Sequence, residues 1–124
     1  MVRLEPPAEL NMPIGEAMFS QRAIRRLDPG RPISDAQLKI LLDAASKAPN
    51  GANRQATRFL VIRDRQRIAA FGALYYEAWW AKRKDQFGWS PGQALPADSP
   101  SAMPALLARE MGDAPAVILI YAMG

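Results

Sequence analysis

The sequence contains no cysteine and no histidine among its 124 residues. Without thiols there are no disulfides, no thiolate metal ligands and no cysteine nucleophile. Without imidazole there is also no candidate for a zinc site of the Cys/His type or for a histidine-based catalytic triad. We therefore predict no metal site and no catalytic triad.

Long apolar runs are also missing. No stretch approaches the ~20 residues of a membrane-spanning helix, and residues 1–7 carry no apolar signal-peptide core. We therefore expect a cytoplasmic protein with no membrane partner. Sixteen basic residues against 12 acidic ones give a formal charge of +4. This small excess, spread along the chain, favours a phosphate-bearing small molecule over nucleic acid as partner.

The length is that of one small domain. Residues 1–12 are rich in proline and are predicted to form an arm, and residues 13–124 are predicted to form the domain. Pro13 suits the first turn of a helix, which we expect to continue to Arg26. The sequence Asp28-Pro29-Gly30 then predicts a turn.

The clearest local prediction is a second helix after Ser34. Ser34 and Gln37 have the spacing of a capping box, in which each side chain meets the other residue's backbone N–H. Ile33 and Leu38 stand where a hydrophobic staple would place them. The apolar stripe predicted to face the core consists of Leu38, Leu41, Leu42 and Ala45.

The second half of the chain predicts two strands separated by helices. The expected elements are a strand at 58–62, a helix from Asp64 to the basic turn at 82–84, a loop at 87–101, a short helix at 105–111 and a strand at 116–122. Both strands are almost wholly apolar, which predicts burial on both faces of a larger sheet. Because two strands do not make such a sheet, we expect either a partner chain or a truncated domain, and we favour truncation.

Two segments together resemble FMN-dependent nitroreductases. Residues 20–27 (SQRAIRRL) are similar to the family's Arg-Arg-Ser-x-Arg run. Residues 45–56 (ASKAPNGANRQA) look like its Ala-x-x-Ala-Pro-Ser-x-x-Asn-x-Gln-Pro-Trp loop. The resemblance covers about residues 13–122, the front part of a family domain. It implies an α+β fold with helices packed on a central mixed sheet, here ending after the second strand.

The resemblance implies that Arg22 reaches the flavin ring and ribityl chain while Arg25 binds the FMN phosphate. Three residues apart on a helix, the two guanidiniums would point to one side and could hold a phosphate together. Ala23 stands where the family usually has a phosphate-binding serine, and Gln21 replaces its first arginine. Each lost charged hydrogen bond costs about 1.5–3 kcal/mol. A solvated basic helix end is the competing interpretation.

In the second segment, Pro49, Asn50, Gly51 and Asn53 resemble residues that approach the flavin from the other subunit of a homodimer. Gly51 permits close backbone approach, and Asn53 offers an amide to the flavin. Asn50 replaces the usual serine. The competing interpretation is a helix-ending loop in which Asn and Gly supply only turn geometry.

What the resemblance implies about mechanism is that FMN carries the chemistry and no side chain is catalytic. NAD(P)H would donate a hydride to the flavin, which would pass it to a nitroaromatic, a quinone or a similar small-molecule acceptor. Arg22 is the candidate for stabilising the reduced flavin near its N1 and O2 atoms. Two alternatives remain open. One is a truncated, non-catalytic flavoprotein fragment, and the other is a basic nucleic-acid-binding module. The second ranks last because Tyr75 and Trp79 occupy apolar helix positions expected in a core or an interface.

Overall fold

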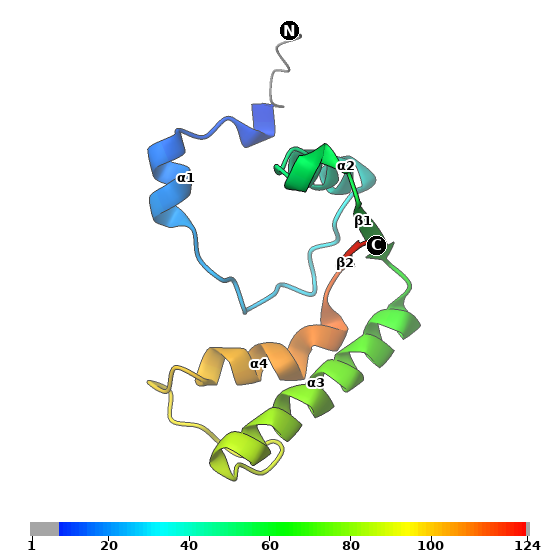
Figure 1. Ribbon diagram of the computed structural model, residues 1–124. Helices are drawn as coiled ribbons and strands as arrows, with labels where there is room; N and C mark the ends of the chain where they lie inside the picture. Colours follow the sequence, from blue (N-terminus) through cyan, green and yellow to red (C-terminus); the bar gives the residue numbers. More distant parts are fainter. Residues whose placement is uncertain (1–7, 124) are drawn as a thin grey trace, which may run out of the picture.

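The structure, a computed structural model, describes residues 8–123. The elements follow in the order η1 (Ala8–Leu10), α1 (Ile14–Ser20), α2 (Asp35–Ser46), η2 (Gly51–Asn53), β1 (Thr57–Ile62), α3 (Arg65–Phe87), α4 (Ala102–Glu110), η3 (Met111–Asp113) and β2 (Val117–Ala122). This is an α+β arrangement, as predicted (Figure 1). Most of the predicted N-terminal arm lies outside the described residues, and Ala8–Leu10 within it form a 3₁₀ turn.

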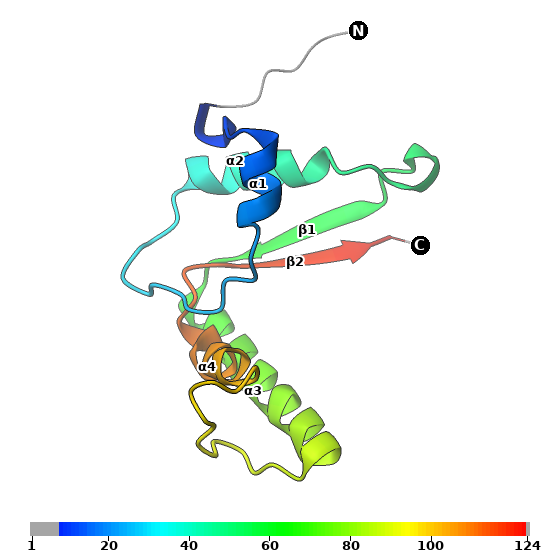
Figure 2. The same cartoon turned by 90° about the vertical axis from the view of Figure 1, so that its left-hand side faces the viewer.

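The sheet of the described residues is an antiparallel pair. Thr57 of β1 stands opposite Ala122 of β2, and Ile62 stands opposite Val117. Figure 2 shows α2 alongside this pair, while α3 and α4 lead away from the end where β1 passes into α3. The prediction that both strands are buried is wrong for most positions: Leu60 is 51% exposed and Ile120 is 67% exposed. In β2, full burial is confined to the end beside α3, where Val117 lies, and the last three residues of the strand are exposed.

The largest packed unit is the hairpin formed by α3, α4 and η3. Asp64 begins α3 as predicted, because its Oδ1 accepts a hydrogen bond from the Arg67 N–H at 2.9 Å. Gly88 ends the helix in the left-handed region at φ 70°, which a glycine adopts without strain. Both views show α3 and α4 side by side and antiparallel (Figures 1 and 2). The hairpin returns the chain to the sheet.

A small core lies where this hairpin meets the sheet. Ile68 is fully buried and packs with Ala114 and Val117. Partly buried apolar side chains complete the cluster: Leu27, Ile62, Phe71 and Leu119. Arg65 closes the cluster through hydrogen bonds from its guanidinium to the carbonyls of Ala114 (2.6 Å) and Gly112 (3.3 Å).

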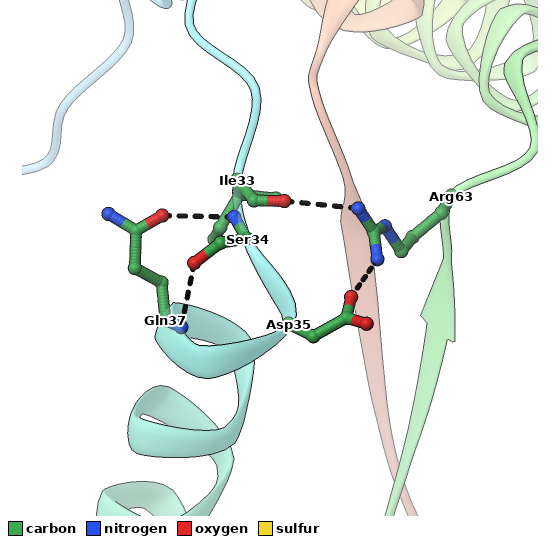
Figure 3. A network of polar contacts seen from close by, with 5 residues as sticks. All are labelled: Ile33, Ser34, Asp35, Gln37 and Arg63. Atoms are coloured by element: carbon green, nitrogen blue, oxygen red, sulfur yellow. Dashed lines mark hydrogen bonds and ion pairs between the residues drawn. The ribbon is translucent and has the colours of Figure 1, made fainter.

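The start of α2 confirms the predicted capping box (Figure 3). The Gln37 N–H donates to Ser34 Oγ at 3.2 Å, and the Ser34 N–H donates to Gln37 Oε1 at 2.9 Å. Arg63, just after β1, donates to the Ile33 carbonyl at 3.1 Å and pairs with the Asp35 carboxylate. The network therefore ties the beginning of α2 to the end of β1. Of the predicted apolar stripe, Leu38 is buried, but Leu41 is 47% exposed.

The chain leaves an unusually large surface uncovered. Its accessible surface is 10056 Å², whereas a compact monomer of this mass exposes about 6,600 Å². Helix α1 buries no residue, and Ile14 and Phe19 on it are 79% and 84% exposed. Ile24 in the segment after α1 is 73% exposed. Surface that is open and apolar in this way is typical of contacts with another protein surface.

Within residues 8–123, no helix is both long and apolar enough to cross a bilayer.

Candidate functional site

The loop between α2 and β1 has an unusual backbone. Three of its residues that are not glycine, Ala52, Asn53 and Gln55, lie in the left-handed region with φ of 53°, 51° and 51°. Asparagine tolerates this region, but alanine and glutamine are held there at a cost of roughly 1–2 kcal/mol each. Strain of this kind persists where surrounding contacts fix it, and it clusters at functional sites.

The side chain of Asn50 fixes the conformation of this loop. Asn50 Oδ1 accepts a hydrogen bond from the backbone N–H of Gln55 at 3.0 Å. Gln55 in turn donates from Nε2 to Asn53 Oδ1 at 2.5 Å, and the Asn53 N–H donates to the Asn50 carbonyl at 3.1 Å. The predicted binding residues Asn50 and Asn53 are therefore joined through Gln55, to which the sequence had assigned no role.

Removing the Asn50 oxygen should loosen the loop. We expect Asn50→Ala to speed hydrogen exchange of the Gln55 backbone N–H by about 2- to 10-fold, because a neutral hydrogen bond contributes about 0.5–1.5 kcal/mol. Asn50→Asp keeps the accepting oxygen and should leave the exchange rate near that of the wild type. Equal acceleration in both variants, measured by NMR, would show that the side-chain oxygen does not hold the loop.

Two of the predicted loop residues line a pocket. Pro49 and Asn50 border a cavity of about 340 Å³ beside the C-terminal end of α2. The other lining residues are Ala45, Ser46, Ala48, Gln55, Thr57, Phe59 and Ile120. Phe59 and Ile120 come from β1 and β2 and stand opposite each other in the sheet. Gly51 and Asn53 do not line this cavity, but lie in the adjacent turn η2.

The predicted arginine residues are not on a helix. Helix α1 ends at Ser20, and Gln21 follows with ψ of 124°, so Arg22, Ala23 and Arg25 lie in an irregular segment. The prediction of a helix to Arg26 is wrong, and with it the argument that helical spacing points both guanidiniums to one side. Two physical reasons apply: an isolated short helix is only marginally stable, and Leu27 packs on the core instead.

The two guanidiniums interact with nearby backbone. Arg22 Nη1 donates to the carbonyls of Gln21 at 2.7 Å and Phe19 at 3.2 Å. Arg25 Nη1 donates to the Ala23 carbonyl at 3.4 Å. These contacts are local, and those of Arg22 supply donors to carbonyls at the end of α1. The hydrogen bonds of both guanidiniums are therefore to the backbone of their own part of the chain.

One chain does not bring the arginine segment and the loop together. Neither Arg22 nor Arg25 lines the cavity that Pro49 and Asn50 border. Both views place α1 and the segment after it away from the turn η2 that follows α2 (Figures 1 and 2). The candidate residues thus form two separate groups on the surface of the molecule.

Comparison with known proteins shows which family the chain belongs to. A family model described as the Nitroreductase family matches residues 19–123. The chain belongs to the nitroreductase family. No individual curated protein and no solved structure gave a match. The family consists of flavin-dependent oxidoreductases, so this nitroreductase-family chain is of that general type.

Both candidate segments lie inside the part matched to the nitroreductase family. The match begins at Phe19, just before the arginine segment, and continues through the loop and both strands. In this nitroreductase-family chain, sequence reasoning missed Gln55, Phe59 and Ile120 as parts of the loop site. Gln55 could have been suspected because it stands between the turn and the strand, whereas Phe59 and Ile120 become neighbours only through sheet pairing.

Proposed function

We propose that the protein is an FMN-dependent oxidoreductase that works as a homodimer, with each flavin site built from the arginine segment of one subunit and the loop of the other. It passes a hydride from NAD(P)H through the flavin to a nitroaromatic, quinone or similar acceptor. The observation that carries the proposal is that both segments lie within the family match yet are separated and exposed within one chain.

The donor chemistry of the two segments suits the parts of FMN. Guanidiniums bind phosphate through paired, charge-assisted hydrogen bonds, which fits Arg25. A Cβ placed on Gly51 would meet no atom within 4 Å, so the backbone of the turn is open to a flat ring. Pro49 and Asn50 border a cavity of about 340 Å³, within the range of small-molecule sites.

Each residue has a distinct part in this proposal. Arg25 holds the phosphate, and Arg22 places positive charge near N1 and O2 of the ring. Ala23 has no hydroxyl and contributes only its backbone. The residues of the loop, Pro49, Asn50, Gly51 and Asn53, orient the ring from the second subunit. FMN, when bound, supplies the hydride chemistry, so no side chain needs to act as an acid or base.

The exposed surface supports a dimer. The chain exposes about 3,500 Å² more than a compact monomer of its mass. Two chains together have about 7,000 Å² of such excess, more than enough for the roughly 2,000–5,000 Å² that the two subunits of an obligate homodimer bury. Much of the exposed apolar surface belongs to α1 and the segment after it, which carries Arg22 and Arg25. A subunit contact in this region would bring the arginines beside a neighbouring chain.

The visible spectrum of the purified chain, with and without added FMN, tests the proposal together with the mass in solution. A yellow dimer whose flavin bands bleach when NADH or NADPH is added would support it. A colourless protein that ignores added FMN would contradict it and favour the non-catalytic fragment.

Arg25→Ala should weaken FMN binding by about 10- to 150-fold, because a hydrogen bond to a charged group contributes about 1.5–3 kcal/mol. The fold should remain intact, because the Arg25 guanidinium makes only a local contact with the Ala23 carbonyl. A fluorescence titration with FMN measures the change.

The matched control for this substitution is Arg26→Ala, which removes the same charge from the neighbouring exposed residue. It should bind FMN almost as the wild type does, apart from a small general electrostatic effect. Equal losses in the two variants would show that Arg25 acts only through net charge. Unchanged affinity in Arg25→Ala would remove Arg25 from the site.

A further inference from the structure

A second cavity lies between the C-terminal half of α3, the loop at 88–101 and α4. Its volume is about 360 Å³, and it shares no lining residue with the cavity beside Asn50. Tyr76 and Trp80 of α3 form one wall, and Leu106 and Arg109 of α4 form another. In Figure 1 this region is the end of the hairpin that points away from the sheet.

Trp80 gives this cavity an unusual feature. The side chain is only 3% exposed, and its Nε1 atom is buried with no hydrogen-bond partner among the described residues. The indole N–H can only donate, and a buried tryptophan N–H usually finds an acceptor. Leaving a buried donor unpaired costs about 1–3 kcal/mol. An acceptor bound in this region would recover that free energy.

A second unpaired donor lies one turn further along α3. Arg83 Nε is buried without a partner, although Arg83 Nη1 donates to Gln86 Oε1 at 3.1 Å. The guanidinium of Arg83 also lies 4.8 Å from the centre of the Trp79 ring, which fixes its position on the helix. Arg83 does not line the cavity. Among the buried unpaired donors of the described residues, Trp80 Nε1 is therefore the one that belongs to a lining residue.

The cavity itself also presents donors and no carboxylate. Arg109 lies at the rim with its side chain 69% exposed, and its contact with Glu110 is a solvated pair between sequence neighbours, which contributes little. Gln93 uses its Oε1 to accept from the Ser90 N–H at 2.8 Å, so its amide group remains as a donor. The lining contains no Asp or Glu.

The remaining walls suit a flat apolar group. The rings of Tyr76 and Trp80 lie 6.2 Å apart with 60° between their planes, so a third ring could contact one by its face and the other by its edge. Ala94, Leu95, Ala102 and Ala105 add apolar surface. The loop beside the cavity contains a local turn closed by the hydrogen bond from the Gln93 N–H to the Ser90 carbonyl at 3.2 Å.

We propose that this cavity binds a small aromatic monocarboxylate, with its ring against Tyr76 and its carboxylate accepting from the Trp80 indole N–H and from Arg109. The site is independent of the flavin: it uses other residues and needs no second subunit. A failure of this proposal would therefore leave the proposed oxidoreductase function untouched, and the reverse also holds.

Benzoate is the probe for the experiment, and the indole N–H resonances of the ¹⁵N-labelled full chain are the readout. The three resonances are assigned with Trp79→Phe, Trp80→Phe and Trp89→Phe. Benzoate should shift the Trp80 resonance downfield in a saturable way, because its N–H gains an acceptor. Benzamide, which lacks the charge, should bind at least about tenfold more weakly.

Charge-removing variants separate the site from general effects. Arg109→Gln should weaken benzoate binding at least about tenfold, because Arg109 lines the cavity. Lys82→Gln removes the same charge from an exposed residue of α3, and it should bind benzoate as the wild type does. Arg109 is mostly solvated, so Arg109→Gln keeps the test valid even where Trp80→Phe fails to fold.

Three results would overturn the proposal. One is a Trp80 resonance that does not move with benzoate up to about 10 mM, well above a millimolar dissociation constant. Another is equal binding of benzoate by Lys82→Gln and Arg109→Gln. The third is a shift that persists in Arg109→Gln and disappears when FMN is added, because benzoate would then occupy the flavin site. A shift that survives FMN and is lost in Arg109→Gln supports the proposal.

Discussion

Replacing Gly72 by alanine should destabilise the protein by about 3 kcal/mol or more, at the upper end of overpacking costs. A Cβ at this position would lie 2.4 Å from both the Cα and the N of Gly112 and 3.2 Å from the carbonyl carbon of Met111. All three atoms belong to the backbone of η3, so no flexible side chain can move away. The gain of about 1 kcal/mol that alanine usually brings to a helix interior is too small to compensate.

Gly112→Ala is the matched control on the other side of the same contact. Its added Cβ would meet Ala69 Cα at 3.5 Å, which is ordinary van der Waals contact. We expect the free energy of unfolding to change by less than about 1 kcal/mol. Urea unfolding of both variants measures the difference. Equal losses would mean that α3 and η3 do not approach as closely as the structure shows.

Mixing two inactive variants should restore flavin binding if the sites are shared between subunits. Arg25→Ala damages the arginine segment, and Gly51→Leu places a bulky side chain on the loop where the structure leaves open space. Each variant alone should bind FMN poorly. When the two are co-expressed, about half of the dimers are mixed, and each mixed dimer has one intact site. About a quarter of the wild-type FMN sites should therefore return.

Flavin absorbance per subunit after gel filtration measures this recovery. If each site were instead built within one chain, every chain in the mixture would carry a defect and no binding would return. The double variant carrying both substitutions, mixed with wild type, is the control. If sites are shared, each site of a mixed dimer carries one defect, so only the wild-type homodimers, about a quarter of the dimers, bind FMN. If each site lies within one chain, about half of all sites stay intact.

Local features of the fold could be predicted because they depend on neighbours in the sequence. Ser34 and Gln37 meet across one helical turn, and Asp64 accepts from a backbone N–H three residues on. The positions of strands β1 and β2 could be predicted from their runs of apolar residues, but the exposure of these residues could not. The length of an apolar run predicts a strand, but burial depends on what else packs on the sheet.

The end of α1 shows where local reasoning fails. The apolar residues from Ile14 to Ile24 have nearly helical spacing, yet the helix ends at Ser20. Helices this short take their stability from packing, and α1 buries nothing. Leu27 instead joins the cluster around Ile68, a contact across more than 40 residues that no local pattern contains. Arg22 and Arg25 therefore lie outside the helix.

The candidate site was predictable in its residue types but not in its geometry. The motif around Asn50 and Asn53 identified the loop, and the family match includes it. Its left-handed backbone at Ala52 and Gln55 was not predictable, because neither residue favours that conformation. Contacts such as that between Asn50 Oδ1 and the Gln55 N–H hold it in place, and they appear only when the loop is closed.

The hairpin of α3 and α4 also bears on how the chain folds. Strands β1 and β2 are far apart in the sequence, and the entropy lost in closing a flexible loop grows with its length. Helix α3 and the turn η3 contact each other directly through Gly72 and Gly112, so the formed hairpin holds Ile62 and Val117 near each other. The strand pair then closes over a short effective distance. We therefore expect sheet pairing to follow formation of the hairpin, and a disrupted glycine contact between α3 and η3 to slow it.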